Sequence, residues 1–388
     1  MSLILDEHRQ YLADDRRLDA FARAIARQVR PGDVVLDLAA GTGILGMLAC
    51  RAGAARVYAV ETGGIVSVAR AFAQANGIAD RMVFIRGLST RITLPERVDV
   101  VVSDLTGHLG IEAGAFEYFD DARRRLMKPG GGTIPCGLEF HVAALESDDL
   151  RSRLDFWSSI APAQFDVSSA RSIAINTGYP AFVAPEQLLS APRTFGRVAL
   201  PAPSLGPVAG TTEVTITRAG RLDGIAAWCT VELAPGVSMS NSPVDPERIA
   251  RRQVMLPFDG PTQVAPGDRL AVSIHMLPTQ LIVTWRVSLA RRSGETRSFS
   301  HSTFNGMLVT GEDRITTDPE WRPSLTPAGL ARQTVLELCD GRHALREIER
   351  GVFQRHQDLL QSEEAAAAFV AEVLSPYGLI ERAGLPDR

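Results

Sequence analysis

Apolar residues in the first third of the chain recur with two alternating spacings. Short unbroken apolar runs predict buried strands at residues 34–38, 56–61, 82–86 and 98–102. Apolar residues at helical spacing predict helices at 9–29, 44–52, 63–76 and 113–127, and Pro31-Gly32 ends the first of them. This alternation predicts a Rossmann-like α/β domain, with a parallel sheet and right-handed crossovers, over residues 1–133.

The pattern changes after Lys128-Pro129-Gly130-Gly131-Gly132. Short alternating runs separated by Pro and Gly predict an antiparallel β-barrel or sandwich over residues 134–312; they are Thr212–Thr217, Ala227–Leu233, Leu270–His275 and Gln280–Leu289. A helical arm is expected to interrupt this domain near 147–180, where Leu150, Leu154 and Trp157 form an apolar face.

A third domain is expected over residues 313–388. Three short helices are predicted at 326–338, 344–354 and 363–375, followed by the apolar segment Tyr377–Ile380. Three helices and a final strand are typical of a small winged-helix domain.

Composition excludes several classes of function. The 388 residues carry a net charge of −4 and no basic block, which argues against a nucleic-acid partner. The four cysteines are scattered without the spacing of a metal site. No signal peptide and no apolar run of 18 residues is visible, so we expect no membrane insertion and a reducing cytoplasm as the default location.

The first βα turn carries the strongest chemical signal. Gly41-Thr42-Gly43-Ile44-Leu45-Gly46 fits the G-x-G-x-x-G turn that holds nucleotides, and Glu61 at the end of the second strand can bind ribose hydroxyls. Asp37, four residues before Gly41, would repel a pyrophosphate and attract a cationic ligand. We therefore expect S-adenosylmethionine, which carries an ammonium and a sulfonium, rather than a nicotinamide coenzyme; the alternative is that Asp37 merely caps a turn.

Further polar residues follow the strands at the same edge of the predicted sheet. Gly87–Ser89 and Ser103-Asp104 should face the crevice that Asp37 and Glu61 line. Asp104, His108 and Glu112 lie in the loop after the fourth strand and are the candidate catalytic residues, since a carboxylate or imidazole can orient an amine or take its proton. The alternatives are a turn cap for Asp104, a loop histidine for His108 and a helix cap for Glu112.

Residues 5–310 together resemble the protein arginine methyltransferases. His8–Arg17 is similar to that family's H-x-x-M-L-x-D-x-x-R helix, and Asp37–Leu45 with Glu61 resembles its cofactor motifs. The resemblance implies that Arg17 binds the methionine carboxylate of S-adenosylmethionine and that His8 lies near the active site. It also implies cofactor contacts at several further positions, namely Ala39, Gly41, Gly43, Thr62, Leu88 and Ser89.

The acceptor side departs from that family. The family's S-E-W-M-G-Y-x-x-x-x-E loop holds a guanidinium between two glutamates, whereas here Asp104 stands at the first position, Ala113 at the second and Glu112 one place early. Its T-H-W loop has no counterpart in Glu247–Ala250. The family's dimer implies that Leu150, Leu154 and Trp157 contact a second copy of the chain.

Residues 324–384 resemble PqqD-like domains, which recognise leader peptides. Leu336-Glu337-Leu338-Cys339-Asp340-Gly341 followed by Ile348 is similar to their core motif. Both resemblances imply an N-methyltransferase acting on a peptide or natural-product intermediate, with a precursor leader peptide as partner. A small-molecule or free amino acid methyltransferase, and a non-catalytic peptide-binding scaffold, stay open as alternatives.

Overall fold

The computed structural model of the chain describes residues 4–158, 160–161, 164–201, 206–308 and 320–377. The chain divides into two compact units, Met1–Met307 and Leu308–Arg388, and each has its own hydrophobic core.

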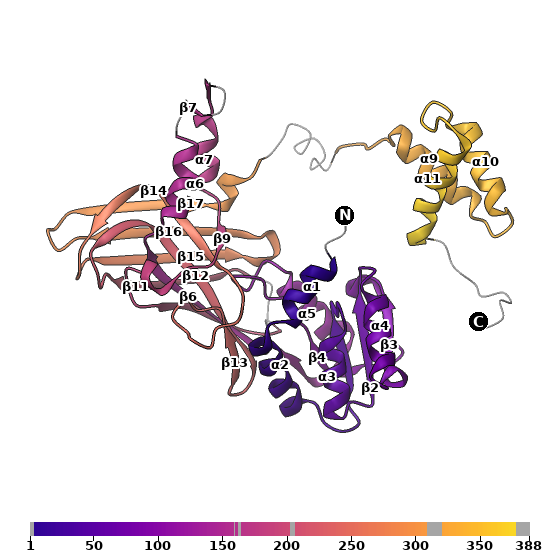
Figure 1. The fold of residues 1–388 in the computed structure, drawn as a ribbon, viewed down its shortest axis with the longest axis horizontal. Coiled ribbons are helices and arrows are strands. Elements are labelled where there is room, and N and C mark those ends of the chain that lie inside the picture. The colour runs from indigo at the N-terminus through magenta and orange to yellow at the C-terminus, as the bar shows by residue number, and fades with distance from the viewer. Residues whose placement is uncertain (1–3, 159, 162–163, 202–205, 309–319, 378–388) are drawn as a thin grey trace. The chain divides into compact units, whose positions relative to one another are not determined.

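The first unit begins with a five-stranded parallel sheet of order β3-β2-β1-β4-β5. Three of its strands, β2, β3 and β4, are labelled in Figure 1. Its strands are β1 (Val34–Leu38), β2 (Arg56–Glu61), β3 (Met82–Arg86), β4 (Val98–Val102) and β5 (Met127–Ile134). The first four have the predicted bounds, because each centres on a short apolar run, which is buried in β1, β2 and β4 and partly buried in the edge strand β3. The fifth was missed, since its Pro and three Gly are tolerated only because β5 is an edge strand, with a register shift against β4.

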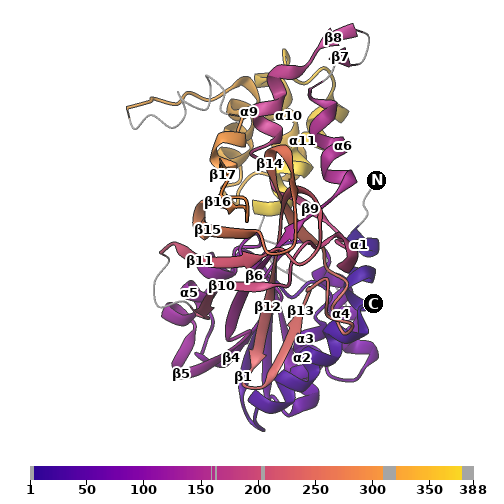
Figure 2. The same cartoon turned by 90° about the vertical axis from the view of Figure 1, so that its left-hand side faces the viewer.

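Helices cover both faces of this sheet (Figure 2). Phe21 and Ile25 pack on one face, and Phe119 packs on the other. The helices are α1 (Ile4–Leu12), α2 (Asp15–Gln28), α3 (Ile44–Ala52), α4 (Val66–Ala75) and α5 (Ala115–Arg125). The single helix predicted at 9–29 is in fact α1 and α2, because the Asp14 side chain caps α2 by accepting a hydrogen bond from Arg17 N.

The strand order indicates where a ligand would bind to this sheet. From β1 the chain moves outward to β2 and β3, then returns to form β4 on the other side of β1. Ligands of such sheets bind where the order reverses, outside the carboxyl ends of the two central strands. Here those ends carry the glycine turn after Leu38 and the loop that begins at Ser103.

Residues after β5 form two large antiparallel sheets, besides a two-stranded one in the helical arm. One has the order β10-β6-β12-β14-β9, with β13 beside β12, and the other has the order β11-β15-β16-β17. The bounds are β6 (Gly137–Leu145), β9 (Tyr179–Ala181), β10 (Arg193–Ala199), β11 (Val208–Thr215), β12 (Gly220–Ala234), β13 (Val237–Ser240), β14 (Gln253–Val264), β15 (Arg269–Leu277), β16 (Ile282–Ala290) and β17 (Thr296–Ser302). The alternating runs predicted as strands overlap β11, β12, β15 and β16, although two of them, 212–217 and 280–289, extend two residues beyond the observed strand. The predicted boundary near residue 134 separates parallel from antiparallel strands, but both sides share one core.

A helical arm follows β6, as predicted. It contains α6 (Asp148–Phe156), β7 (Ile160–Ala161), β8 (Phe165–Asp166) and α7 (Arg171–Ala174). The apolar face expected to contact a second copy is instead used within the chain: Leu150 and Leu154 are fully buried against a cluster that includes Trp228 and Met255. Trp157 is partly buried against the same cluster.

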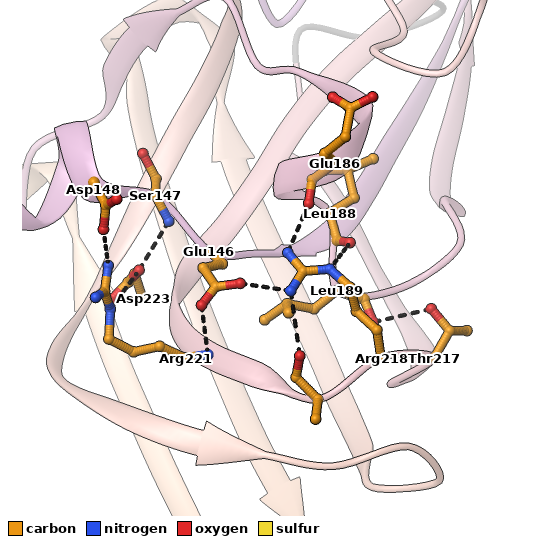
Figure 3. Close-up of polar contacts among 11 residues, drawn as sticks. Glu146, Ser147, Asp148, Glu186, Leu188, Leu189, Thr217, Arg218, Arg221 and Asp223 are labelled. Carbon is orange, nitrogen blue, oxygen red and sulfur yellow. Dashed lines mark hydrogen bonds and ion pairs between the residues drawn. The ribbon is translucent and has the colours of Figure 1, made fainter.

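Buried polar contacts hold the base of the arm to β12 (Figure 3). The Asp223 carboxylate, which is fully buried, accepts hydrogen bonds from Ser147 N at 2.8 Å and Arg221 Nε at 2.9 Å. Ser147 in turn caps α6 through Leu150 N. Beside this pair, Arg218 donates to Glu146 at 2.6 Å. These contacts fix where α6 leaves the sheet.

The second unit contains α9 (Pro327–Leu338), α10 (Leu345–Arg355) and α11 (Glu363–Tyr377), close to the three predicted helices. Val335, Ile348, Val352 and Val370 form its core. Tyr377, predicted to begin a strand, ends α11, and the remainder of that predicted strand at 378–380 lies outside the described residues. Among the described residues, no helix combines the length and apolarity needed to cross a membrane.

Candidate active site at the carboxyl ends of β1 and β4

The turn after β1 has left-handed backbone at three positions. Ala39, Gly41 and Gly43 have φ values of 57°, 54° and 73°. Gly41 and Gly43 adopt this conformation without the cost that a Cβ would add. Ala39, an exposed residue, does carry that cost, and backbone strain of this kind is concentrated at ligand sites.

Asp37 lies beneath this turn, which corrects the expectation that its carboxylate lines an open crevice. It is only 1% exposed, and its Oδ2 accepts a hydrogen bond from Gly46 N at 2.8 Å. Burial, with a smaller contribution from the charge of Glu61, raises the pKa of Asp37 to about 7 despite that hydrogen bond. Asp37 is therefore not a permanent negative charge at neutral pH, although a cation held nearby would favour its ionised form.

Glu61 is joined to the same turn. Its Oε2 accepts from Gly41 N at 3.0 Å, and its Oε1 accepts from Gly63 N at 2.7 Å and from the Thr62 hydroxyl at 3.3 Å. The end of β2 and the glycine turn thus form one hydrogen-bonded edge.

The remaining predicted cofactor residues surround this edge. The His8 ring lies on Gly41, so close that a Cβ built there would come within 2.7 Å of His8 Cε1. Leu88 is half-buried, and Ser89 is buried with its carbonyl accepting from Arg125 at 2.8 Å. Ser103, expected in the crevice, is instead fully buried, and its hydroxyl donates to Leu38 O between β4 and β1.

These residues fit S-adenosylmethionine. Asp37 Oδ1 is buried beneath the turn without a hydrogen-bond partner, so its charge, when ionised, is not compensated there and favours a cationic ligand group on the turn above it. The glycines leave room for a close approach of the ligand to the backbone, and Glu61 lies at the end of the neighbouring strand, where a ribose is bound in such folds.

Asp104 lies at the end of β4 between two arginines. Arg251 Nη2 donates to both of its oxygens at 2.9 Å, and Arg17 Nη1 donates to Oδ2. The side chains of Arg17, Arg251 and Asp104 are only 6%, 10% and 11% exposed. Burial would raise the pKa of Asp104, but the two guanidinium groups outweigh it and hold that pKa below its usual value. Asp104 is therefore a buried, ionised carboxylate that binds guanidinium.

Arg17 thus contacts the loop that follows β4 and contains Asp104, His108 and Glu112, which we call the acceptor loop because it would hold the methyl acceptor. The resemblance had instead assigned Arg17 to the methionine carboxylate of S-adenosylmethionine. Its Nη2 also donates to Tyr11 O at 2.7 Å, and its guanidinium lies 5.1 Å from the Tyr11 ring centre. Both contacts hold it at the junction of α1 and α2.

The loop between β13 and β14 contacts this junction directly. Asp14 accepts from Arg17 N at 3.2 Å through Oδ1 and from Ala250 N at 2.8 Å through Oδ2. Arg16 donates to Pro246 O. One carboxylate thereby joins the start of α2 to the loop that precedes Arg251.

Glu112 and His108 take different parts in the acceptor loop. Glu112 accepts hydrogen bonds from Leu109 N at 2.9 Å and Ile111 N at 3.2 Å, so it closes its own loop rather than capping α5, which begins at Ala115. Burial raises the pKa of Glu112. Burial and the charges of Arg251 and Arg252 lower the pKa of His108, whose Nδ1 is buried without a hydrogen-bond partner. His108 is therefore a neutral imidazole at pH 7.

A cavity of about 710 Å³ lies beside this arrangement. Its lining includes Arg16 and Ala250, the sequence neighbours of the two arginines that bind Asp104, together with Phe182 and Arg248. This cavity is large enough for the portion of an acceptor that lies beyond its reacting nitrogen.

Sequence reasoning missed Arg251. It directly follows the stretch Glu247–Ala250 that was compared with the family's T-H-W loop, and nothing in its local pattern distinguishes it from Arg248 or Arg252. The need for a cation beside Asp104 follows only from its burial, which the structure shows and the sequence does not.

Comparison with known proteins finds matches for both parts of the first unit. Residues 138–289 match the family model of the arginine methyltransferase oligomerization subdomain, and residues 21–138 match that of ribosomal protein L11 methyltransferase. The arginine Nω-methyltransferase of Streptomyces achromogenes is 30% identical over 274 residues, covering 69% of this chain and 75% of that protein. Protein arginine N-methyltransferase 6 of Xenopus laevis is 28% identical over 293 residues, covering 71% and 84%.

Solved structures show the same fold. Arabidopsis thaliana protein arginine methyltransferase 10 aligns with a TM-score of 0.67 at 22% identity, over 77% of this chain and 98% of that one. The Trypanosoma brucei PRMT1 enzyme–prozyme complex with AdoHcy aligns with a TM-score of 0.66 at 20% identity, over 76% and 97%.

Proposed function

The chain belongs to the arginine methyltransferase family, whose members are S-adenosylmethionine-dependent enzymes, and on that premise we propose that it methylates a guanidine nitrogen of a peptide-borne arginine. One observation carries the choice of acceptor. Asp104, beside the predicted cofactor turn, is ionised, buried and already bound to guanidinium groups from two directions. A carboxylate in that state is suited to a planar guanidinium.

S-adenosylmethionine supplies a methyl carbon that is activated by a sulfonium. As the carbon–nitrogen bond forms, the carbon–sulfur bond breaks, sulfur keeps the electron pair, and the guanidine nitrogen loses one proton. The chain's residues orient the nitrogen and accept this proton. Asp104 is suited to orientation because its low pKa makes it a poor base, whereas neutral His108 and Glu112, whose pKa is raised, are suited to receive the proton.

The second unit supports a peptide rather than a free amino acid as acceptor. The sequence that resembles a PqqD-like core ends α9 and forms the turn into α10, where Asp340 accepts hydrogen bonds from Arg342 N and His343 N. Leu336 and Leu345, on either side of this turn, are 46% and 54% exposed. Exposed leucines beside a tight turn are suited to an apolar segment of a leader peptide.

Free arginine is the second candidate. The relative from Streptomyces achromogenes is named an arginine, not a protein arginine, methyltransferase. In that case the second unit would not take part in acceptor binding.

Methyl transfer measured by mass spectrometry distinguishes the two candidates. The full chain and a chain ending at residue 308, which retains the complete core of the first unit, are each incubated with S-adenosylmethionine and either L-arginine or arginine-containing precursor peptides. We expect a methylated peptide from the full chain and at least a ten-fold loss on truncation. Equal activity of both chains on L-arginine would favour the second candidate, and no guanidine product from any acceptor would refute the assignment. Asp104→Asn is the matched inactive control.

A further inference from the structure

The Asp104 carboxylate has little remaining capacity for an acceptor. An ionised carboxylate offers about four acceptor directions. Arg251 Nη2 donates hydrogen bonds to both oxygens, and Arg17 donates a second hydrogen bond to Oδ2, so three of these directions are occupied. Arg251 is further fixed by its Nη1, which donates to the Thr106 hydroxyl at 2.6 Å within the same acceptor loop.

Arg251 also lies within electrostatic reach of both acidic residues of this loop. Its charge favours ionisation of Asp104 and of Glu112. In return, Asp104 raises the pKa of Arg251, although burial opposes this, so the guanidinium stays charged. An internal guanidinium therefore lies where a substrate guanidinium would find its carboxylate.

We propose that Arg251 is an internal competitor for the acceptor, occupying the guanidinium position on Asp104 and thereby setting both the affinity and the choice of substrate. This inference rests on the proposed function, because it assumes that the acceptor presents a guanidinium to Asp104. An incoming guanidinium must exchange with Arg251 rather than bind a free carboxylate. Exchange is feasible because it replaces one charge-assisted pair by another. The apparent affinity for the acceptor is then its intrinsic affinity multiplied by the fraction of time that Arg251 leaves the position open.

Such a competitor favours one kind of substrate. A free small guanidine competes at its bulk concentration, whereas a guanidine on a peptide held elsewhere on the enzyme competes at a millimolar effective concentration. Arg251 thus disfavours free guanidines and leaves tethered ones effective. The pair Arg251–Asp104 is a specificity determinant that a loop with two unpaired glutamates would not provide.

The direct test measures binding of a guanidine that has no carboxylate. Ethylguanidine is titrated calorimetrically into the full chain in the presence of S-adenosylhomocysteine. For Arg251→Ala we expect binding at least ten-fold tighter than for the unchanged chain. Arg251→Gln should also bind ethylguanidine at least ten-fold more tightly. Because glutamine keeps a donor for Thr106, this variant tests the effect of the lost charge while the acceptor loop keeps its conformation. Both variants should remain folded, because Arg17 still pairs with Asp104.

Arg252→Ala is the matched control. It removes the same charge one residue away, from an exposed side chain that lies 5.8 Å from the Phe182 ring and makes no contact with Asp104. We expect its ethylguanidine affinity to stay within about three-fold of the unchanged chain. In turnover assays, Arg251→Ala should lower KM for free guanidines at least ten-fold. The ratio of kcat/KM for peptide substrates to kcat/KM for free guanidines should therefore become smaller.

Two results would overturn the inference. Unchanged ethylguanidine affinity in both Arg251 variants would show that Arg251 does not compete, and weaker affinity would show that it helps to bind the acceptor. If the unchanged chain methylates a guanidine and either result is obtained, only the competitor role fails. If no variant binds or methylates any guanidine, the proposed function fails with it.

Discussion

Replacing Asp104 by alanine should destabilise the first unit more than replacing either arginine that binds it. Asp104→Ala leaves two guanidinium groups, with side chains 6% and 10% exposed, without a carboxylate partner. Removing one member of a buried ion pair costs about 3–5 kcal/mol, largely because the remaining charge stays buried and unpaired. Arg251→Ala leaves Asp104 paired with Arg17, so its cost should be closer to about 1–2 kcal/mol, the order of a lost hydrogen bond.

Urea unfolding of the full chain, followed by tryptophan fluorescence, measures this difference. Trp157, Trp228 and Trp285 lie in the first unit and Trp321 in the second, so the signal reports mainly on the unit that contains Asp104. We expect the midpoint to fall for both variants, with little change in the slope of the transition. An Asp104→Ala variant no less stable than Arg251→Ala would refute the reasoning that one carboxylate balances two buried cations.

Two further predictions concern other buried carboxylates. The folded pKa of Asp37, about 7, exceeds its unfolded value, so the folded state binds more protons between pH 4 and 7 and its stability falls as pH rises through that window, by at most about 4 kcal/mol. Asp37→Asn should flatten this part of the profile in thermal unfolding from pH 5 to 8, and an unaltered slope would contradict the assignment. Asp223→Ala leaves buried Ser147 N without an acceptor and Arg221 without one of its two carboxylates. We expect a loss of about 2–4 kcal/mol in urea unfolding, and exchange of the α6 amides should quicken; unaltered α6 exchange would show that Asp223 does not hold the arm.

The elements that could be predicted from sequence are those whose pattern reflects burial alone. The first four strands and α3 have the predicted bounds, because each is marked by a continuous apolar run or a helical apolar stripe. Edge strand β5 was missed because its open side removes the need for apolar residues, and the break between α1 and α2 was missed because a single capping side chain decides it.

In the candidate site, too, some residues could be placed from the sequence and others could not. Glu61 could be placed beside the glycine turn from the sequence because the two follow adjacent strands, while its binding of a ribose stays a prediction. Arg251 was missed because its partner, Asp104, lies 147 residues earlier. The face of Leu150 and Leu154 was assigned to a dimer from the family resemblance, and an apolar stripe alone does not reveal whether its partner belongs to the same chain.

The double hydrogen bond of Asp14 has a consequence for biosynthesis. Its partner Ala250 lies 236 residues further along the chain, so the amino-terminal helices cannot complete their contacts until about two thirds of the protein has left the ribosome. At about 5–20 residues per second, this leaves the first helices waiting for some ten seconds or more. The junction that α1 and α2 form with the loop before Arg251 is therefore completed only late in translation.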